Sequence, residues 1–66
     1  MEGKIKNLVM DKNFGFIAVE GEEKDVFFHT SALVGIMFDE LNVGDTVTFE
    51  KEQSEKGPRA IDVKRV

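Results

Sequence analysis

The chain has 66 residues, enough for one domain only, and a chain this short buries roughly 60% of the surface that its unfolded form exposes. It lacks cysteine, which excludes disulfide bonds and thiolate metal sites, and no apolar run approaches the roughly 20 residues of a membrane helix. The formal net charge of −4 argues against a surface that holds phosphate groups by strong positive charge. Because no secretory signal pattern precedes Lys4, we expect a cytoplasmic protein with a single domain over residues 1–66.

Turn-forming segments divide the chain into five runs of strand length. In chain order, we predict strands at residues 3–9, 13–19, 25–29, 46–52 and 59–64. The longest connection, residues 31–45, suits a single helical or 3₁₀ turn at 31–33 or at 39–41. Short strands at regular spacing indicate a sandwich or a small barrel, and closing the barrel removes exposed sheet edges. We therefore predict an all-β fold, a five-stranded antiparallel β-barrel.

Side chains alternate between the two faces of a strand, so each predicted strand divides into two sets of residues. One set is almost wholly β-branched or aromatic and is drawn from every predicted strand. We predict that this set forms the core: Ile5, Ile17, Val19, Val26, Phe28, Val47, Phe49, Ile61 and Val63. In the last two predicted strands the other set is polar, as expected of a solvated outer face.

The second and third predicted strands break this pattern, because their outward set is aromatic. Phe14, Phe16, Phe27 and His29 would cluster on the outside, and a contiguous exposed apolar patch usually marks a binding surface. Two other interpretations remain open: the faces are inverted, or the patch binds a protein or a second copy of the chain. Inversion would cost about 1.5–3 kcal/mol for each large apolar side chain placed in water.

Two motifs carry these aromatic residues, Lys12-Asn13-Phe14-Gly15-Phe16-Ile17 and Val26-Phe27-Phe28-His29. They closely resemble the paired ribonucleoprotein motifs of bacterial cold-shock proteins, whose usual forms are Lys-Gly-Phe-Gly-Phe-Ile and Val-Phe-Val-His. Segments at residues 3–6, 43–49 and 56–60 are also similar to the family. The resemblance therefore covers essentially the whole chain.

This resemblance implies an oligonucleotide-binding (OB) barrel that binds single-stranded RNA or DNA and acts as an RNA chaperone or a regulator of transcription or translation. The nucleic-acid-binding positions that it implies are Lys6, Phe14, Phe16, Phe27, His29, Phe38, Lys56 and Arg59. An alternative is a degenerate cold-shock barrel that binds nucleic acid weakly and uses its apolar patch for protein association or dimerisation. We expect a monomer without a membrane partner or a small-molecule substrate.

The first predicted strand departs from the family, which usually continues Lys-Trp-Phe-Asn where this chain has Lys6, Asn7, Leu8 and Val9. Thr30 also occupies a position that is often aromatic in the family. Several basic residues fall near the aromatic patch and suggest a local basic rim, although a merely mixed soluble surface has the same composition. These residues are Lys4, Lys6, Lys12, Lys56 and Arg59.

The titratable residues argue against catalysis. A single histidine, with no cysteine nucleophile and no phosphate-binding glycine loop, gives no arrangement of nucleophile, base and orienting group. We therefore predict that the protein is not an enzyme. Because His29 has no second histidine or cysteine to join it, we also predict no metal site and no cofactor.

Overall fold

Five β-strands and three short 3₁₀ helices make up the computed structural model, which describes residues 1–55 and 57–66. The strands are β1 (Glu2–Val9), β2 (Phe14–Ala18), β3 (Val26–His29), β4 (Thr46–Ser54) and β5 (Gly57–Arg65), and the 3₁₀ helices are η1 (Met10–Lys12), η2 (Thr30–Ala32) and η3 (Phe38–Glu40). Every predicted strand is confirmed with its ends within two residues, and η2 and η3 occupy both turns considered in the longest connection. Within the described residues, no helix is long and apolar enough to cross a membrane.

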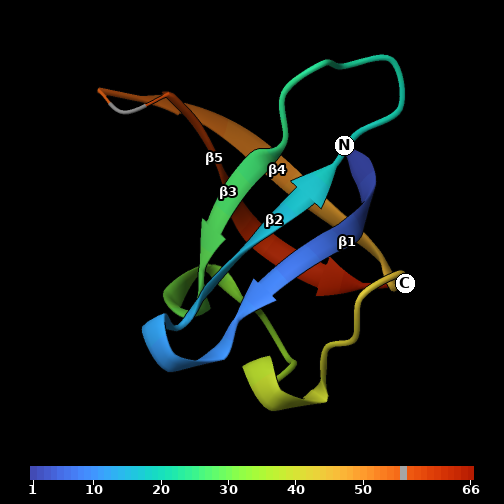
Figure 1. Cartoon of the computed structure of the whole chain (residues 1–66), viewed down its shortest axis with the longest axis vertical. Helices are drawn as coiled ribbons and strands as arrows, with labels where there is room; N and C mark the ends of the chain where they lie inside the picture. Colours follow the sequence, from blue (N-terminus) through green and yellow to red (C-terminus); the bar gives the residue numbers. More distant parts are fainter. Residues whose placement is uncertain (56) are drawn as a thin grey trace.

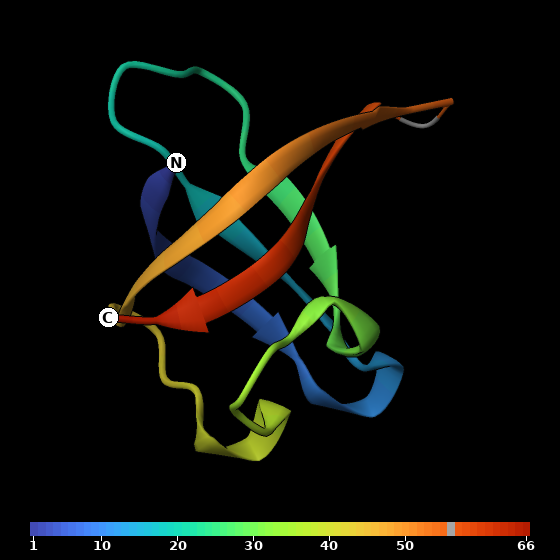
Figure 2. The ribbon, with the colours of Figure 1, turned by 180° about the vertical axis from the view of Figure 1, so that it is seen from behind.

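The strands close into a barrel in the order β1-β2-β3-β5-β4, as Figures 1 and 2 show. Neighbouring strands are antiparallel except β3 and β5, which are parallel and meet where Phe27 lies opposite Arg59. One parallel pair is unavoidable, because five strands arranged in a ring cannot all alternate in direction. The predicted closed barrel is therefore confirmed, and its parallel pair joins β5 to the strand that carries Phe27.

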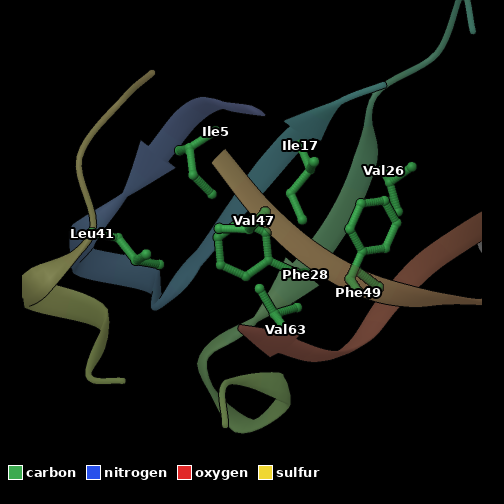
Figure 3. Packing of buried hydrophobic residues seen from close by; sticks show 9 residues of the cluster. Ile5, Ile17, Val26, Phe28, Leu41, Val47, Phe49 and Val63 are labelled. Atoms are coloured by element: carbon green, nitrogen blue, oxygen red, sulfur yellow. The ribbon is translucent and has the colours of Figure 1, made fainter. Parts of the chain in front are cut away.

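The barrel encloses one apolar core, to which every strand contributes (Figure 3). Its buried residues are Ile5, Ile17, Val26, Phe28, Leu41, Val47, Phe49, Ala60 and Val63. Seven of the nine predicted core residues are among them, and Val19 is half-buried and packs against them. Leu41 is not among the predicted residues, because it lies in a connection that has no strand periodicity.

The prediction that Ile61 lies in the core is wrong, and Ala60 is buried in its place. At this point β5 has one residue more than the facing segment of β4, which makes a β-bulge. Asp62 lies in the bulge and has a left-handed φ of 51°. A bulge interrupts the alternation of side chains along its strand, so Ala60 and Val63 both point inward although they are three residues apart.

A second bulge turns Asn7 outward. The register of β1 against β2 shifts at Lys6, where β1 has one extra residue. Strict alternation from the buried Ile5 would point Asn7 into the core, but the bulge places it directly opposite Phe16 instead. Leu8 then packs against the core. Asn7 and Leu8 both depart from the usual cold-shock sequence, but only Asn7 lies on the outer face.

Gly15 allows β2 to lie close over the core. A Cβ atom at Gly15 would stand 2.8 Å from the Phe28 ring and 2.7 Å from the Asn7 carbonyl oxygen. Glycine is therefore required for Phe28 to fill the barrel beneath β2. The turn before β2 ends at Asn13, whose φ of 59° is left-handed, as expected of an asparagine in this place.

Candidate functional site

Three phenylalanine side chains, from Phe14, Phe16 and Phe27, form one cluster on the outside of β2 and β3. The ring centroids lie 5.6 Å apart for Phe14 and Phe16, 5.4 Å for Phe14 and Phe27, and 6.1 Å for Phe16 and Phe27. All three residues are half-buried, whereas Ile17 and Phe28 of the same strands have no exposed surface. The predicted faces are therefore confirmed, and the inverted arrangement is excluded. We name these three residues the aromatic patch.

The strand register places two rings of the aromatic patch in a row of side chains that crosses the strands shown in Figure 1. From β4 to β1, the directly opposed residues are Glu52, Arg59, Phe27, Phe16 and Asn7. Directly opposed residues of neighbouring strands share one face of the sheet. The row therefore presents a carboxylate, a guanidinium, two aromatic rings and an amide on the outside of the barrel.

A second, shorter row runs beside the first one through Phe14, which lies opposite His29 on β3 and opposite Val9 on β1. The Nδ1 atom of His29 accepts a hydrogen bond of 3.1 Å from the backbone N–H of Ser31 in η2. This bond holds the imidazole beside the aromatic patch.

The aromatic patch forms one wall of an open groove of about 760 Å³. The other wall comes from the β4–β5 hairpin, which projects beyond the barrel in Figures 1 and 2, and it consists of Ser54, Glu55, Gly57, Pro58 and Arg59. A hollow of about 560 Å³ shares Phe16 with the groove and reaches Asn7, and another of about 220 Å³ shares Phe27 and reaches His29. Because each hollow shares lining residues with the groove, we name the groove and the two hollows together the track.

Two basic residues that border the aromatic patch are each paired with a carboxylate. The Nε atom of Arg59 donates a hydrogen bond of 2.8 Å to Glu52, and its Nη2 atom contacts the same oxygen. The Nζ atom of Lys6 lies 3.3 Å from the Oδ2 atom of Asp25. The expected basic rim is therefore neutralised at both of these positions.

Six of the eight predicted binding residues line the track: Lys6, Phe14, Phe16, Phe27, His29 and Arg59. Phe38 lies elsewhere, because its half-buried ring packs against the core with its centroid 6.2 Å from that of Phe28. Lys56 lies outside the described residues. The part that each of the eight residues takes in binding stays a prediction.

The residues of this face that are absent from the predicted binding residues include Val9, Asp25 and Glu52. Glu52 has a usable signal, because counting along the hairpin from the opposed pair Ser54 and Gly57 places it opposite Arg59. Val9 has no comparable signal, since its outward position depends on the bulge in β1. Asp25 meets Lys6 only through the conformation of the connection between β2 and β3.

Comparison with known proteins finds similarity over the whole chain. Residues 1–66 match the model of the family described as the "cold-shock" DNA-binding domain. Similar proteins include the cold shock-like protein CspE of Bacillus anthracis, which is 46% identical over 63 residues (96% of this chain and 92% of the relative). The cold shock-like protein CspC of Escherichia coli is 41% identical over 63 residues (96% and 91%). A solved structure titled drosophila Unr CSD456 has a TM-score of 0.79 at 27% identity, with 98% of this chain and 26% of that chain covered.

Proposed function

The chain belongs to the "cold-shock" DNA-binding domain family, and from that premise we propose that it binds single-stranded RNA or DNA by stacking bases on the aromatic patch. The observation that carries the proposal is the cluster of Phe14, Phe16 and Phe27 along an open track on the barrel wall. Base–aromatic stacking contributes about 1–3 kcal/mol per base and tolerates any sequence, because every base has a π-face. Unpaired strands suit such a face, since their bases are free to lie on it.

Stacking also accounts for nucleic-acid binding by a chain whose net charge is −4, because the aromatic contribution does not depend on charge. A protein that binds unpaired bases stabilises the open form of a folded RNA, since a ligand shifts an equilibrium toward the state that it binds. We therefore propose an RNA chaperone or a cold-shock-type regulator of transcription or translation. We also propose that the protein acts as a monomer in the cytoplasm, binds no small-molecule substrate and catalyses no reaction.

A titration of a fluorescently labelled oligothymidine tests the proposal, and the label is necessary because the chain has no tryptophan or tyrosine. We expect binding with a shallow salt dependence, since only a few cations border the track. The slope of log affinity against log salt should be roughly −0.7 per phosphate contacted, or about −1.4 to −2.1 for two or three contacts. A slope near −5 would show that phosphate contacts dominate over stacking.

Sizing of the protein alone completes this experiment, because an apolar patch also suits protein association. The proposal expects a monomer at the concentrations of the titration. Two results together would favour association through the aromatic patch instead. The protein would not bind the oligonucleotide at low salt, and it would form a dimer that dissociates when Phe27 is replaced by a charged residue.

The variant Asn7→Trp should bind single strands more tightly than the parent chain. Asn7 is exposed and lies directly opposite Phe16, so a tryptophan there would extend the stacking surface without displacing the core. We expect a gain of about 1–3 kcal/mol, or roughly 5- to 150-fold. The new indole should also report binding through its fluorescence.

Stability supplies the control for this variant, since a surface substitution usually changes the free energy of unfolding by no more than about 0.5 kcal/mol. The variant Leu8→Trp offers a matched comparison, because Leu8 packs against the core and its replacement should destabilise the barrel without improving affinity. A folded Asn7→Trp variant with unchanged affinity and unresponsive emission would place residue 7 outside the binding surface.

A further inference from the structure

Two carboxylates lie beside the aromatic patch, and each is paired with a cation that borders the track. Glu52 accepts hydrogen bonds from Arg59, and Asp25 lies 3.3 Å from Lys6. Both pairs are open to water, with side-chain exposures of 51% for Arg59 and 43% for Glu52, and of 62% for Lys6 and 31% for Asp25. Exposed ion pairs contribute little to folding. Stability of the barrel therefore does not account for their presence on this face.

The position of Glu52 follows from the strand register. It lies directly opposite Arg59, which in turn lies directly opposite Phe27. The carboxylate thus stands in the same row as the stacking surface, one strand beyond the guanidinium. A phosphate that approaches Arg59 meets the negative charge of Glu52 and competes with it for the same N–H donors.

We propose that Glu52 and Asp25 are specificity determinants, which occupy Arg59 and Lys6 and so restrict this face to strands with unpaired bases. The inference rests on the proposed function. A duplex stacks its bases internally and presents its phosphates outside, so its binding to this face depends on the two cations. A single strand gains stacking on the aromatic patch in addition. Pairing the cations with carboxylates therefore weakens duplex binding more than single-strand binding.

The variant Glu52→Gln tests this inference, because it removes the charge and keeps the size of the side chain. We expect its affinity for labelled oligothymidine to rise about five-fold, the effect of one nearby unit charge in water. Its affinity for a labelled, blunt-ended and fully paired DNA duplex should rise by a larger factor. The slope of log affinity against log salt should become steeper by about 0.7 to 0.9, corresponding to one further phosphate contact.

The variant Glu22→Gln is a matched control, since it makes the same change in net charge at a residue that does not line the track. Glu22 pairs with Lys51 at 2.7 Å, and neither residue lines the groove or its two hollows. We expect this variant to leave the preference for single strands unchanged. In a chain that already carries Arg59→Gln, the gain from Glu52→Gln should be smaller, because only the direct repulsion between Glu52 and phosphate is then removed. An equal gain in duplex binding from both glutamine variants, or a gain of undiminished size without Arg59, would overturn the inference.

These measurements separate failure of the inference from failure of the proposed function. Circular dichroism should give the parent spectrum and unfolding midpoint for Glu52→Gln, because its side chain is open to solvent. If the parent chain binds oligothymidine through the aromatic patch while Glu52→Gln changes neither the salt slope nor the duplex preference, only the inference fails. If neither chain binds oligothymidine, the proposed function fails and the inference fails with it.

Discussion

Replacing Phe16 and Phe27 together with alanine is expected to weaken binding of a labelled single-stranded oligonucleotide by about 2–6 kcal/mol, the sum of two stacking platforms at about 1–3 kcal/mol each. The two residues are directly opposed on β2 and β3, and their ring centroids lie 6.1 Å apart. Because neighbouring rings are coupled, the two single variants should not add exactly as independent sites would. The measurement is a titration of the single and double variants at constant salt.

The barrel should remain folded in this double variant, because both rings lie on the outer wall and the buried cluster is untouched. Circular dichroism during urea unfolding would show this directly. Val43→Ala is a suitable control, since Val43 is an apolar residue with 64% exposure that does not line the track. A folded double variant with the parent affinity would rule out stacking on these rings as the source of binding.

Replacing Phe28 with alanine should lower the free energy of unfolding, whereas the Phe16 and Phe27 variants should lower affinity and keep the fold. The ring has no exposed surface, lies beneath Gly15 and packs against Phe38. Removal of a buried phenylalanine ring typically costs about 3–5 kcal/mol, through lost burial and the cavity that remains. A domain of this length has a total stability of about 3–10 kcal/mol, so the variant should lose between about a third and all of its stability.

Urea or thermal unfolding followed by circular dichroism measures this effect without an intrinsic fluorophore. Phe28→Leu is the matched variant, because it retains most of the apolar volume and should lose less stability than the alanine variant. Phe27→Ala, one residue earlier on the same strand, should keep the fold and lose affinity. A Phe28→Ala protein as stable as the parent chain would contradict the placement of this ring in the core.

Comparison of Phe27 and Phe28 also distinguishes two causes of lost binding, unfolding of the barrel and removal of a contact with the ligand. A variant that loses binding because it unfolds resembles one that loses a contact when only affinity is measured. Phe27 and Phe28 separate the two causes, because alternation along β3 points one ring outward and the next inward. Affinity and unfolding should therefore be measured on the same preparations of both variants.

The sequence by itself determined the barrel and the faces of its central strands. In β2 and β3 the side chains alternate without interruption, so parity alone correctly places Ile17 and Phe28 inside and Phe16 and Phe27 outside. The positions of the turn-forming segments located the ends of all five strands to within two residues. Both signals are local, because they depend on the period of a strand and on the backbone preferences of a few residues. The resemblance to cold-shock proteins added the ligand class.

Only the tertiary structure decided where the alternation breaks and which side chains meet across strands. The bulge in β1 turns Asn7 outward, and the bulge in β5 buries Ala60 in place of Ile61. Neither is visible in the order of apolar residues, because a bulge arises where two paired strands curve to close the barrel. The row from Glu52 through Arg59 to Phe27 likewise exists only after β5 pairs with both β4 and β3, since register is a property of the closed sheet and not of any one strand.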